Sequence, residues 1–468
     1  MDIEPKRIIR VLVVFTGLFI SLVVYLSYFE VFEAAKIQKN AYNKRQWVNE
    51  ENILRGMIVD RNGNTLAYSE KTENGQIRYY PYENIYSHII GYSSKEYGKA
   101  GLESSYNQEL LAIDAGNPIQ EFKDKLSKTE KKGNHLILTI DHDLQVYANQ
   151  KLKGKKGAIV ALNPQTGEIY AMVSKPDFNP SKLKENWTEI IENPDSPLLN
   201  RGTMGLYTPG SVFKVITATA ALEDEEVSKG FQCKGSVSIE GYTLKDYGET
   251  AHGAIDLEEA LVKSCNVAFS QMGLELGKTK LKDTAQRYWF NKEISFDLST
   301  KNSIFPESKI VTKPDLGASA IGQGKILVTP LNMAMVAASI SNDGRMMKPI
   351  LVKEVLSPEG RTIKTGRVAT LSQVSSEEVI AQLKEMMVQV VEKGTGRNAR
   401  IKNVKVAGKT GTAENETKKT HAWFIGFAPA EDPKIAIAVV LESIDKTGGE
   451  SAAPIARDIM IKALEKLQ

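Results

Sequence analysis

Apolar and polar positions divide the chain into one short, continuously apolar segment near the N-terminus and a long remainder of mixed pattern. Residues 11–29, VLVVFTGLFISLVVYLSYF, contain no charged side chain. As a helix this segment would be roughly 28 Å long, about the thickness of the hydrocarbon core of a bilayer. The apolar region of a cleaved signal peptide is only about 7–15 residues long, so the pattern favours an uncleaved transmembrane anchor.

The charges beside this anchor predict its orientation. Lys6, Arg7 and Arg10 precede it, whereas Glu30 and Glu33 follow it. By the positive-inside rule we expect a cytoplasmic tail before the anchor and an extracytoplasmic location for everything after it. The stretch that follows is polar and charged, with scattered apolar positions, and predicts a juxtamembrane stalk. The expected tail comprises residues 1–10, and the expected stalk comprises residues 30–54.

Residues 55–150 show short alternating patterns that predict a small mixed domain. RGMIVDRNGNTLAYS (55–69) predicts two strands joined by an Asn-Gly turn. GLESSYNQELLAI (101–113) predicts a short helix, and KKGNHLILTID (131–141) predicts a return to a strand. We find no catalytic set of residues within this region, which is expected to serve as a pedestal.

Residues 151–468 predict a larger second domain. GAIVALNPQTGEIYAMVS (157–174) contains two apolar runs on either side of a turn sequence, which indicates a hairpin. A long helical stretch, broken by loops, is expected next, over residues 211–338. Strand patterns return at 403–414, 421–428 and 434–443, and an amphipathic helix is expected at 453–467. A hairpin, a helical insertion, three further strands and a final helix predict an α+β fold, with an antiparallel five-stranded sheet flanked by helices.

Composition adds one exclusion to this outline. Of the 468 residues, 42% are apolar and 25% are charged, which is ordinary for a folded protein. The net charge of +3 over this length gives no basic footprint for a nucleic acid. We therefore expect no nucleic-acid partner.

The stretch TPGSVFKVITATAAL (208–222) places a serine and a lysine at the start of an otherwise apolar helix. Ser211 and Lys214 are three positions apart and so share one helix face. A serine hydroxyl is a poor nucleophile until a neighbouring base removes its proton. A lysine can act as that base only when its amine is neutral, which requires burial or a nearby positive charge.

The apolar helix is expected to bury Lys214, and Lys409, in GKTGTAE (408–414), is the candidate for a nearby positive charge. On a strand, Lys409 and Gly411 point one way while Thr410 and Thr412 point the other way. Gly411 leaves room for a substrate backbone along the strand, and Thr412 offers a hydroxyl and an N–H group. A third stretch, KSCNVAF, adds Ser264 and Asn266, which could complete a polar pocket.

Each of these short motifs is weak alone, and their combination and order carry the interpretation. A second Lys-Thr-Gly sequence, residues 446–448, lies between the last strand and the final helix. Two adjacent glycines predict a loop there, so we do not assign it to the site. Ser-x-x-Lys, Ser-x-Asn and Lys-Thr-Gly together are the motifs of penicillin-binding proteins and class A β-lactamases.

Over nearly its whole length the sequence resembles the class B penicillin-binding proteins, which are membrane-anchored D,D-transpeptidases of bacterial peptidoglycan synthesis. The similar segments are RGMIVDRNG, GLESSYNQEL, LTIDHDLQ, GAIVALNPQTGEIYAMVSKPDFNP, NRGTMGLYTPGSVFK, IGQGKILVTPLNMA, KTGTAE and HAWFIGFAP. The resemblance implies the fold of the penicillin-binding and serine β-lactamase group, on a small dimerisation-like pedestal. It also implies a location in the bacterial cell membrane as a single-pass protein.

By this resemblance Ser211 is the acylated nucleophile, Lys214 is its base, and Ser264 and Asn266 form the second motif. The third motif is Lys409, Thr410, Gly411 and Thr412, with the backbone N–H groups of Ser211 and Thr412 as the oxyanion hole. The implied substrates are peptidoglycan stem peptides ending in D-Ala-D-Ala, with a possible carboxypeptidase side activity. A β-lactam antibiotic would form a stable acyl-enzyme. The pedestal is too short for a glycan-polymerising domain, so a membrane polymerase of the shape, elongation, division and sporulation family is the implied partner.

The two cysteines of the chain define a candidate metal site. Cys233 and Cys265 flank Asp246 and His252, and together these four side chains could bind a structural zinc ion. A disulfide and two unpaired thiols are alternatives that the sequence leaves open. The chemistry itself is expected to need no cofactor.

Three other functions fit parts of the sequence. A membrane-tethered serine β-lactamase would need a deacylating base, and we find no convincing one between the second and third motifs. A β-lactam sensor would need a signalling region inside the cell, where only residues 1–10 are expected. A role as a cell-wall scaffold, with or without catalysis, is the third alternative.

Overall fold

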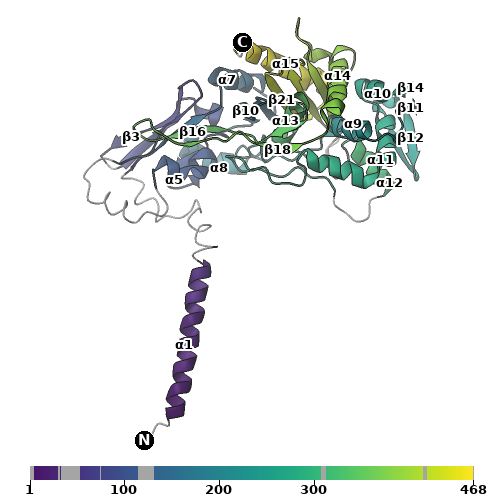
Figure 1. The fold of residues 1–468 in the computed structure, drawn as a ribbon. Helices are drawn as coiled ribbons and strands as arrows, with labels where there is room; N and C mark the ends of the chain where they lie inside the picture. Colours follow the sequence, from purple (N-terminus) through teal and green to yellow (C-terminus); the bar gives the residue numbers. More distant parts are fainter. Residues whose placement is uncertain are drawn as a thin grey trace.

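The computed structural model describes residues 5–29, 32, 53–73, 75–113, 131–306, 312–414 and 419–466. Helix α1 (Pro5–Tyr28) leads toward a body made of a smaller and a larger part (Figure 1). Its apolar side chains are exposed, and Ile9–Tyr28 is long and apolar enough to cross a membrane. Of the expected stalk, only residues 32, 53 and 54 lie among the described residues.

The pedestal is built around a six-stranded sheet with the strand order β17-β16-β8-β2-β3-β4. Its strands are β2 (Ile58–Val59), β3 (Thr65–Thr72), β4 (Gly75–Tyr79), β8 (His135–Leu138), β16 (Val352–Leu356) and β17 (Thr362–Thr365). The β16–β17 hairpin comes from the C-terminal half of the chain and pairs with β8 through Val352 opposite Leu138. The pedestal sheet is therefore completed by a segment more than two hundred residues away in the sequence.

Short elements cover the pedestal sheet. They are β1 (Ile53–Leu54), η2 (Glu83–Tyr86), β5 (Ser93–Ser94), β6 (Gly98–Lys99), α4 (Gly101–Ser105), α5 (Asn107–Leu110) and β7 (Lys131–Lys132).

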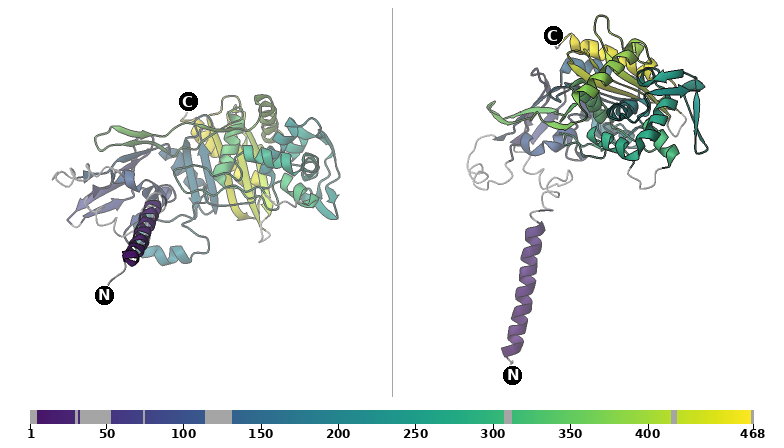
Figure 2. Two further views of the ribbon diagram at one scale, coloured as in Figure 1. Left: turned by 60° about the horizontal axis from the view of Figure 1, so that its bottom comes forward. Right: turned by 45° about the vertical axis from the view of Figure 1, so that its right-hand side comes forward.

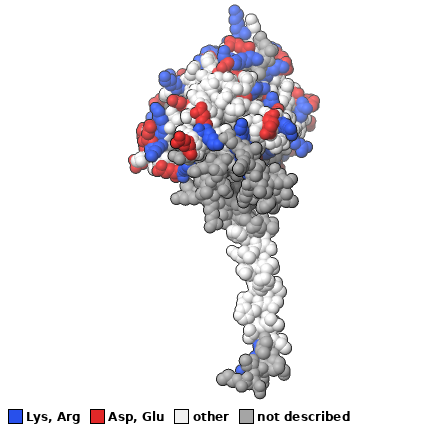
Figure 3. Space-filling model, turned by 90° about the vertical axis from the view of Figure 1, so that its left-hand side faces the viewer, with Lys and Arg blue, Asp and Glu red and all other residues white. Residues whose placement is uncertain are grey.

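On the face of the body in Figure 3, basic and acidic side chains are interspersed, whereas α1 is almost free of charge along its length.

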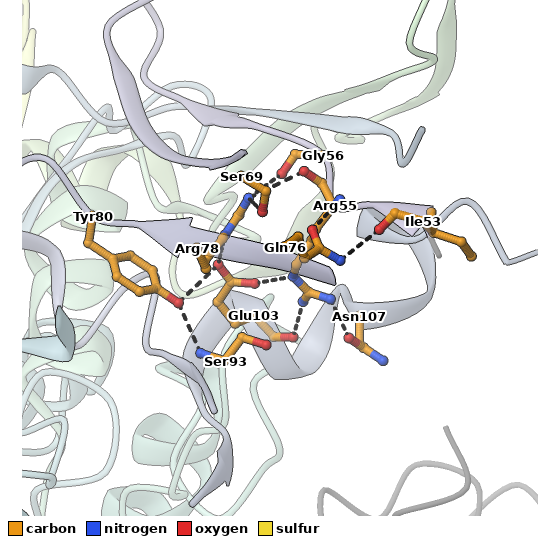
Figure 4. A network of polar contacts seen from close by, with 10 residues as sticks. All are labelled: Ile53, Arg55, Gly56, Ser69, Gln76, Arg78, Tyr80, Ser93, Glu103 and Asn107. Carbon is orange, nitrogen blue, oxygen red and sulfur yellow. Dashed lines mark hydrogen bonds and ion pairs between the residues drawn. The ribbon is translucent and has the colours of Figure 1, made fainter. Parts of the chain in front are cut away.

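A network of buried charges lies at the centre of the pedestal (Figure 4). Glu103, on α4, is fully buried and pairs with Arg55 Nε at 2.5 Å and with Arg78 Nε at 2.7 Å. Arg55 also donates to the Asn107 side chain at 2.6 Å, and Arg78 donates to the carbonyl of Gly56 at 2.7 Å. This network joins β4, α4, α5 and the segment before β2 through one carboxylate.

The larger domain contains an antiparallel five-stranded sheet with the order β10-β9-β21-β20-β19. Its strands are β9 (Gly157–Leu162), β10 (Ile169–Lys175), β19 (Ala407–Glu414), β20 (Thr420–Ala428) and β21 (Ile435–Ile444). The α+β fold and the five-stranded sheet predicted from the sequence are confirmed. β19 is an edge strand, so one side of its backbone is not paired within the sheet.

Both faces of this sheet are buried, which explains why its strands read as nearly continuous apolar runs. Val160 and Trp423 belong to the core on one face, and Ile159 and Phe424 belong to the core on the other face. The first core includes α9 (Lys214–Glu223) and α13 (Pro330–Ser341), and the second includes α7 (His142–Lys151) and α15 (Gly448–Leu464). The catalytic candidates of the sequence lie on the α9 side.

The segment between β10 and β19 is helical with small strand pairs. Its helices are η3 (Pro180–Lys182), α8 (Leu183–Glu192), η4 (Gly210–Phe213), η5 (Tyr247–Glu249), α10 (Leu257–Lys263), α11 (Asn266–Arg287), α12 (Lys313–Ala320), α14 (Glu377–Glu392) and η6 (Arg397–Ala399), besides α9 and α13. Besides β16 and β17 of the pedestal sheet, its strands are β11 (Gly230–Cys233), β12 (Ser236–Ile239), β13 (Tyr242–Lys245), β14 (Gly253–Asp256), β15 (Arg345–Met347) and β18 (Thr370–Gln373). Strands β11 to β14 lie at the end of the body opposite the pedestal (Figures 1 and 2).

Candidate active site

The Ser211–Lys214 pair sits on a tight helical turn beside the edge strand. Ser211 lies in the 3₁₀ turn η4, which continues directly into α9, and the Lys214 N–H donates to the Ser211 carbonyl. Gly210 has a φ of +54°, and a Cβ there would approach the Thr412 carbonyl oxygen to 2.8 Å. Only glycine fits such a close approach at this backbone angle. The sequence Pro-Gly-Ser thus presses the serine-bearing turn against β19.

Lys214 is fully buried and makes three polar contacts with the second motif. Its Nζ donates to the Ser264 carbonyl at 2.6 Å, to Asn266 Oδ1 at 2.7 Å and to Ser264 Oγ at 3.3 Å. Ser264 lies between α10 and α11 with a φ of 57° and a ψ of 39°, a left-handed conformation that is strained for a non-glycine residue. This turn aims both the carbonyl and the hydroxyl of Ser264 at the lysine.

Lys409 approaches the same hydroxyl from the sheet. Its Nζ donates to Ser264 Oγ at 2.9 Å and to the Thr410 carbonyl at 3.1 Å, and its side chain is fully buried. Ser264 Oγ therefore lies between two amines that come from different elements. An oxygen so placed can accept a proton from one amine and donate to the other, which is the geometry of a proton relay.

Burial sets the protonation of both lysines. It lowers the pKa of Lys214 to about 8, against the opposing charges of Asp246 and Cys265. Burial, followed by the positive charge of Lys214, also lowers the pKa of Lys409 well below its usual value. The sequence predicted that burial on the apolar helix and the charge of Lys409 would together lower the pKa of Lys214. In the structure burial has this effect, and the charge of Lys214 lowers the pKa of Lys409 instead. The two amines meet at the Ser264 hydroxyl, to which both of them donate.

The threonines of the third motif point away from the lysine, as strand geometry predicts. Thr410 Oγ1 lies 2.6 Å from Thr395 Oγ1 on the opposite side of β19. Gly411 packs against the serine turn, because a Cβ there would approach the Pro209 carbonyl oxygen to 2.8 Å. The hydroxyl of Thr412 accepts a hydrogen bond from the Gly448 N–H at 3.2 Å. This bond leaves the Thr412 hydroxyl hydrogen available for another acceptor.

The two glycines of the second Lys-Thr-Gly sequence predicted a loop, but in the structure they begin a helix. Thr447 is the N-cap of α15 in a capping box with Glu450, and Gly448 and Gly449 form the first turn of this helix. A Cβ on Gly448 would approach the Gly411 carbonyl oxygen to 2.3 Å. The first turn of α15 therefore packs directly against the Lys-Thr-Gly sequence of β19. Among the described contacts, Lys446 takes no part in the Ser264 cluster.

The four candidate zinc ligands lie together beside the second motif. Cys233 Sγ is 3.0 Å and Cys265 Sγ is 3.2 Å from Asp246 Oδ2, and His252 Nδ1 is 3.6 Å from the same oxygen. All four ligand atoms lie within 4.8 Å of one another. Tetrahedral zinc with bonds of about 2.0–2.3 Å places its ligand atoms about 3.3–3.8 Å apart, so the set fits zinc after small shifts. Both cysteines are free thiols in this structure.

This cluster is joined to the catalytic candidates through Asn266. The Asn266 N–H donates to Asp246 Oδ1, and its side-chain Nδ2 donates to the Lys245 carbonyl at 2.9 Å. Asn266 Oδ1 in turn accepts from Lys214. A ligand bound by Asp246 and Cys265 would therefore fix the turn that contacts the candidate base.

Several residues that contribute to the site were not identified from the sequence. Thr395 holds Thr410, Gly448 holds Thr412, and Trp423 Nε1 donates to the Thr208 carbonyl at 3.1 Å beside the serine turn. Only Gly448 had a signal in the sequence, because it belongs to the second Lys-Thr-Gly sequence. The other residues acquire their role through contacts between distant segments, which local pattern does not predict.

Two family models match the chain. The penicillin binding protein transpeptidase domain matches residues 157–461, and the penicillin binding protein A dimerisation domain matches residues 55–136. Among curated proteins, the chain is 34% identical to the peptidoglycan D,D-transpeptidase PbpA of Mycolicibacterium smegmatis, over 98% of each sequence.

Solved structures agree with these matches. The chain is similar to penicillin-binding protein A from M. tuberculosis in its ceftriaxone acyl-enzyme complex, with a TM-score of 0.83 and 33% identity, over 89% of this chain and all of the other. The penicillin G acyl-enzyme complex of the same protein gives a TM-score of 0.81 and 33% identity, over 88% of this chain and all of the other.

Proposed function

Because the chain belongs to the class B penicillin-binding proteins, we propose that it is a peptidoglycan D,D-transpeptidase that acts through an acyl-enzyme on Ser211. The observation that supports the residue assignment is the convergence of Lys214 and Lys409 on Ser264 Oγ, because Lys214 lies one helical turn after Ser211. The substrate is the D-Ala-D-Ala end of a peptidoglycan stem peptide. β-Lactam antibiotics bind covalently as mimics of this donor, as they do in the related acyl-enzyme structures.

In the first half of the reaction, neutral Lys214 removes the proton of Ser211 as its Oγ attacks the carbonyl of the penultimate D-alanine. The developing oxyanion is bound by the backbone N–H groups of Ser211 and Thr412. The peptide bond then breaks, and the proton passes from Lys214 through Ser264 Oγ to the departing D-alanine nitrogen. The acyl-enzyme remains on Ser211, with Lys214 neutral again.

In the second half, an amine of a neighbouring strand attacks the acyl carbonyl. Lys214 takes a proton from this amine, and the proton returns to Ser211 Oγ as the acyl bond breaks. The product is a new peptide bond between two strands. Lys409, with Thr410, Gly411 and Thr412 along β19, binds the donor, and Asn266 holds the Lys214 amine in place.

Cross-linking in vitro tests this function directly. With a donor stem pentapeptide and an acceptor amine, the purified chain should release D-alanine and form the cross-linked dimer. Prior treatment with penicillin should block both products. A serine β-lactamase would instead hydrolyse the penicillin many times per second and recover, and that result would contradict the proposal.

The pH dependence of acylation should follow the candidate base. Since only neutral Lys214 accepts the Ser211 proton, the rate of penicillin acylation is expected to rise about tenfold per pH unit below the pKa of Lys214, which burial lowers to about 8. Above that pH the rate should level off. Stopped-flow acylation between pH 6 and 9 measures this profile, with melting temperature at each pH as the control for unfolding. A flat profile over this range would exclude Lys214 as the titrating base.

Transpeptidases of this family act without a cofactor, and we propose that the chain nevertheless carries one structural zinc ion, held by Cys233, Asp246, His252 and Cys265. The support is the donor set and the spacing of its atoms. Zinc there would supply no chemistry to the reaction. It would fix Asp246, which accepts from the Asn266 N–H.

Elemental analysis of the purified chain should find about one zinc per molecule, and Cys233→Ser and His252→Ala should each lower this content several-fold. Glu249→Ala is the matched control, because Glu249 is exposed in the same loop and lies outside the cluster. Full titration of two thiols without any zinc would contradict the proposal, and so would the loss of both thiols to a disulfide.

The proposal also covers location and partner. α1 would anchor the chain in the bacterial cell membrane, with residues 1–10 in the cytoplasm and the catalytic domain outside. Transpeptidation joins glycan strands that another enzyme must have polymerised. A membrane glycan polymerase of the shape, elongation, division and sporulation family is therefore the proposed partner.

A further inference from the structure

A cavity of about 660 Å³ lies between the pedestal and the transpeptidase domain. None of the catalytic candidates lines it, so it is separate from the site around Ser211. Small-molecule sites in proteins occupy about 300–1,000 Å³ and often lie between domains. We call it the junction cavity, with Tyr92, Ser104, Gln108, Phe178, Leu198 and Thr203 as its reference residues.

The junction cavity has walls of two kinds. Ser104 and Gln108, from α4 and α5, present hydroxyl and amide groups. Tyr92, Phe178 and Leu198 provide aromatic and aliphatic surface on other parts of the lining. A pyranose ring likewise has two kinds of surface, apolar C–H faces and a polar rim of hydroxyl groups. A sugar can therefore use both kinds of wall at once.

The charges around the cavity argue against an ionic ligand. Of the described residues that line it, none is acidic and Lys99 is the only lysine or arginine. Burial lowers the pKa of His88 to about 4, so this lining residue is neutral at physiological pH. A lipid phosphate or a stem peptide with its carboxylates would need more cations, because buried charges must be paired. The ligand chemistry that fits is uncharged and rich in hydroxyl and amide groups.

Two further observations indicate a formed site. Trp187 of α8 stacks on Tyr97 of the pedestal at 4.2 Å between ring centroids, and Phe178 packs edge-on against Tyr92. These contacts hold the two domains together beside the cavity. Thr203 is 1% exposed, and its Oγ1 has no hydrogen-bond partner among the described residues. A buried hydroxyl without a partner is uncommon and leaves an unused group in the lining residue.

We propose that the junction cavity binds a neutral N-acetylated sugar of a glycan strand, at a site distinct from the cleft that binds the stem peptide. The class of ligand is inferred from the residues that line the cavity. The identification of cell-wall glycan as the natural source of this ligand rests on the proposed function. A glycan bound there would hold the strand to the enzyme while its peptide reacts at Ser211.

Calorimetric titration of the full-length protein in detergent tests this site, with the β-1,4-linked tetrasaccharide of N-acetylglucosamine as the neutral probe. The protein is first acylated with penicillin, so that the cleft is blocked. We expect saturable binding of one tetrasaccharide per chain. Ser104→Trp, which fills the cavity, should weaken binding at least tenfold, and Gln108→Ala should weaken it about threefold. The matched controls Ser295→Trp and Gln150→Ala lie outside the cavity at exposed positions and should bind as the parent does.

Three results of these titrations would overturn the proposal. Absence of binding, or equal binding by a folded Ser104→Trp variant, would overturn the proposal. So would competition from the charged stem pentapeptide for the same site on the acylated protein, because the ligand class would then be wrong. The titration is repeated on protein without penicillin, so a failure of acylation would count against the proposed function and leave the cavity result intact.

Discussion

Replacing Ser211 by alanine is expected to abolish covalent labelling by fluorescent penicillin and to reduce cross-link formation by at least about 10⁴-fold. The substitution removes the oxygen that forms the acyl bond, and the structure offers no substitute at that position. The Lys214 amine is buried against Ser264 and Asn266. Ser264 Oγ already accepts hydrogen bonds from the amines of Lys214 and Lys409. Labelling on gels and intact-protein mass spectrometry measure the adduct directly.

The Ser211→Ala variant should remain folded, because Ser211 is only half-buried and the change removes a single oxygen. Its melting temperature is expected to stay within a few degrees of the parent. Ser228→Ala, at an exposed serine outside the three motifs, is the control and should label at the parental rate. An adduct of penicillin mass that persists on Ser211→Ala would place the nucleophile elsewhere and refute the assignment.

Local pattern was sufficient for the parts of the fold whose elements are buried on both faces. The hairpin β9–β10 and the strands β20 and β21 are almost completely apolar, and each was predicted close to its place. The three-residue spacing of Ser211 and Lys214 is likewise a local property of one helical turn. Their convergence with Ser264 and Lys409 was expected from the order of the motifs and the family resemblance, since no local rule brings together segments so far apart.

Long-range pairing explains what the sequence did not reveal. The β16–β17 hairpin joins the pedestal sheet through β8, although nothing in the sequence of the hairpin indicates which strand it pairs with. The final helix begins at Gly448, five residues before its expected start, because Thr447 and Glu450 cap it and Gly448 fits against Gly411. The β11–β14 strands within the helical stretch present the zinc candidates, and their pairing likewise depends on contacts between separate segments.

Removing the carboxylate of Glu103 should cause the largest loss of stability that we expect from any single change in the pedestal. Burial by itself would raise the pKa of Glu103, but Arg55 and Arg78 lower it, so the group is an anion in the folded protein. In Glu103→Ala the two guanidinium groups would lose their shared carboxylate inside the pedestal. Breaking a buried ion pair by removing one partner costs about 3–5 kcal/mol.

This cost should be specific to the buried network of Figure 4. Glu70→Ala, at the exposed C-terminal end of β3, removes the same kind of side chain from the same sheet and should change stability by less than about 0.5 kcal/mol. Thermal unfolding and limited proteolysis between residues 55 and 113 compare the two variants. Equal stability of Glu103→Ala and Glu70→Ala would show that Arg55 and Arg78 find other partners. A selective loss in Glu103→Ala would show instead that one buried carboxylate joins β4, α4 and the segment before β2.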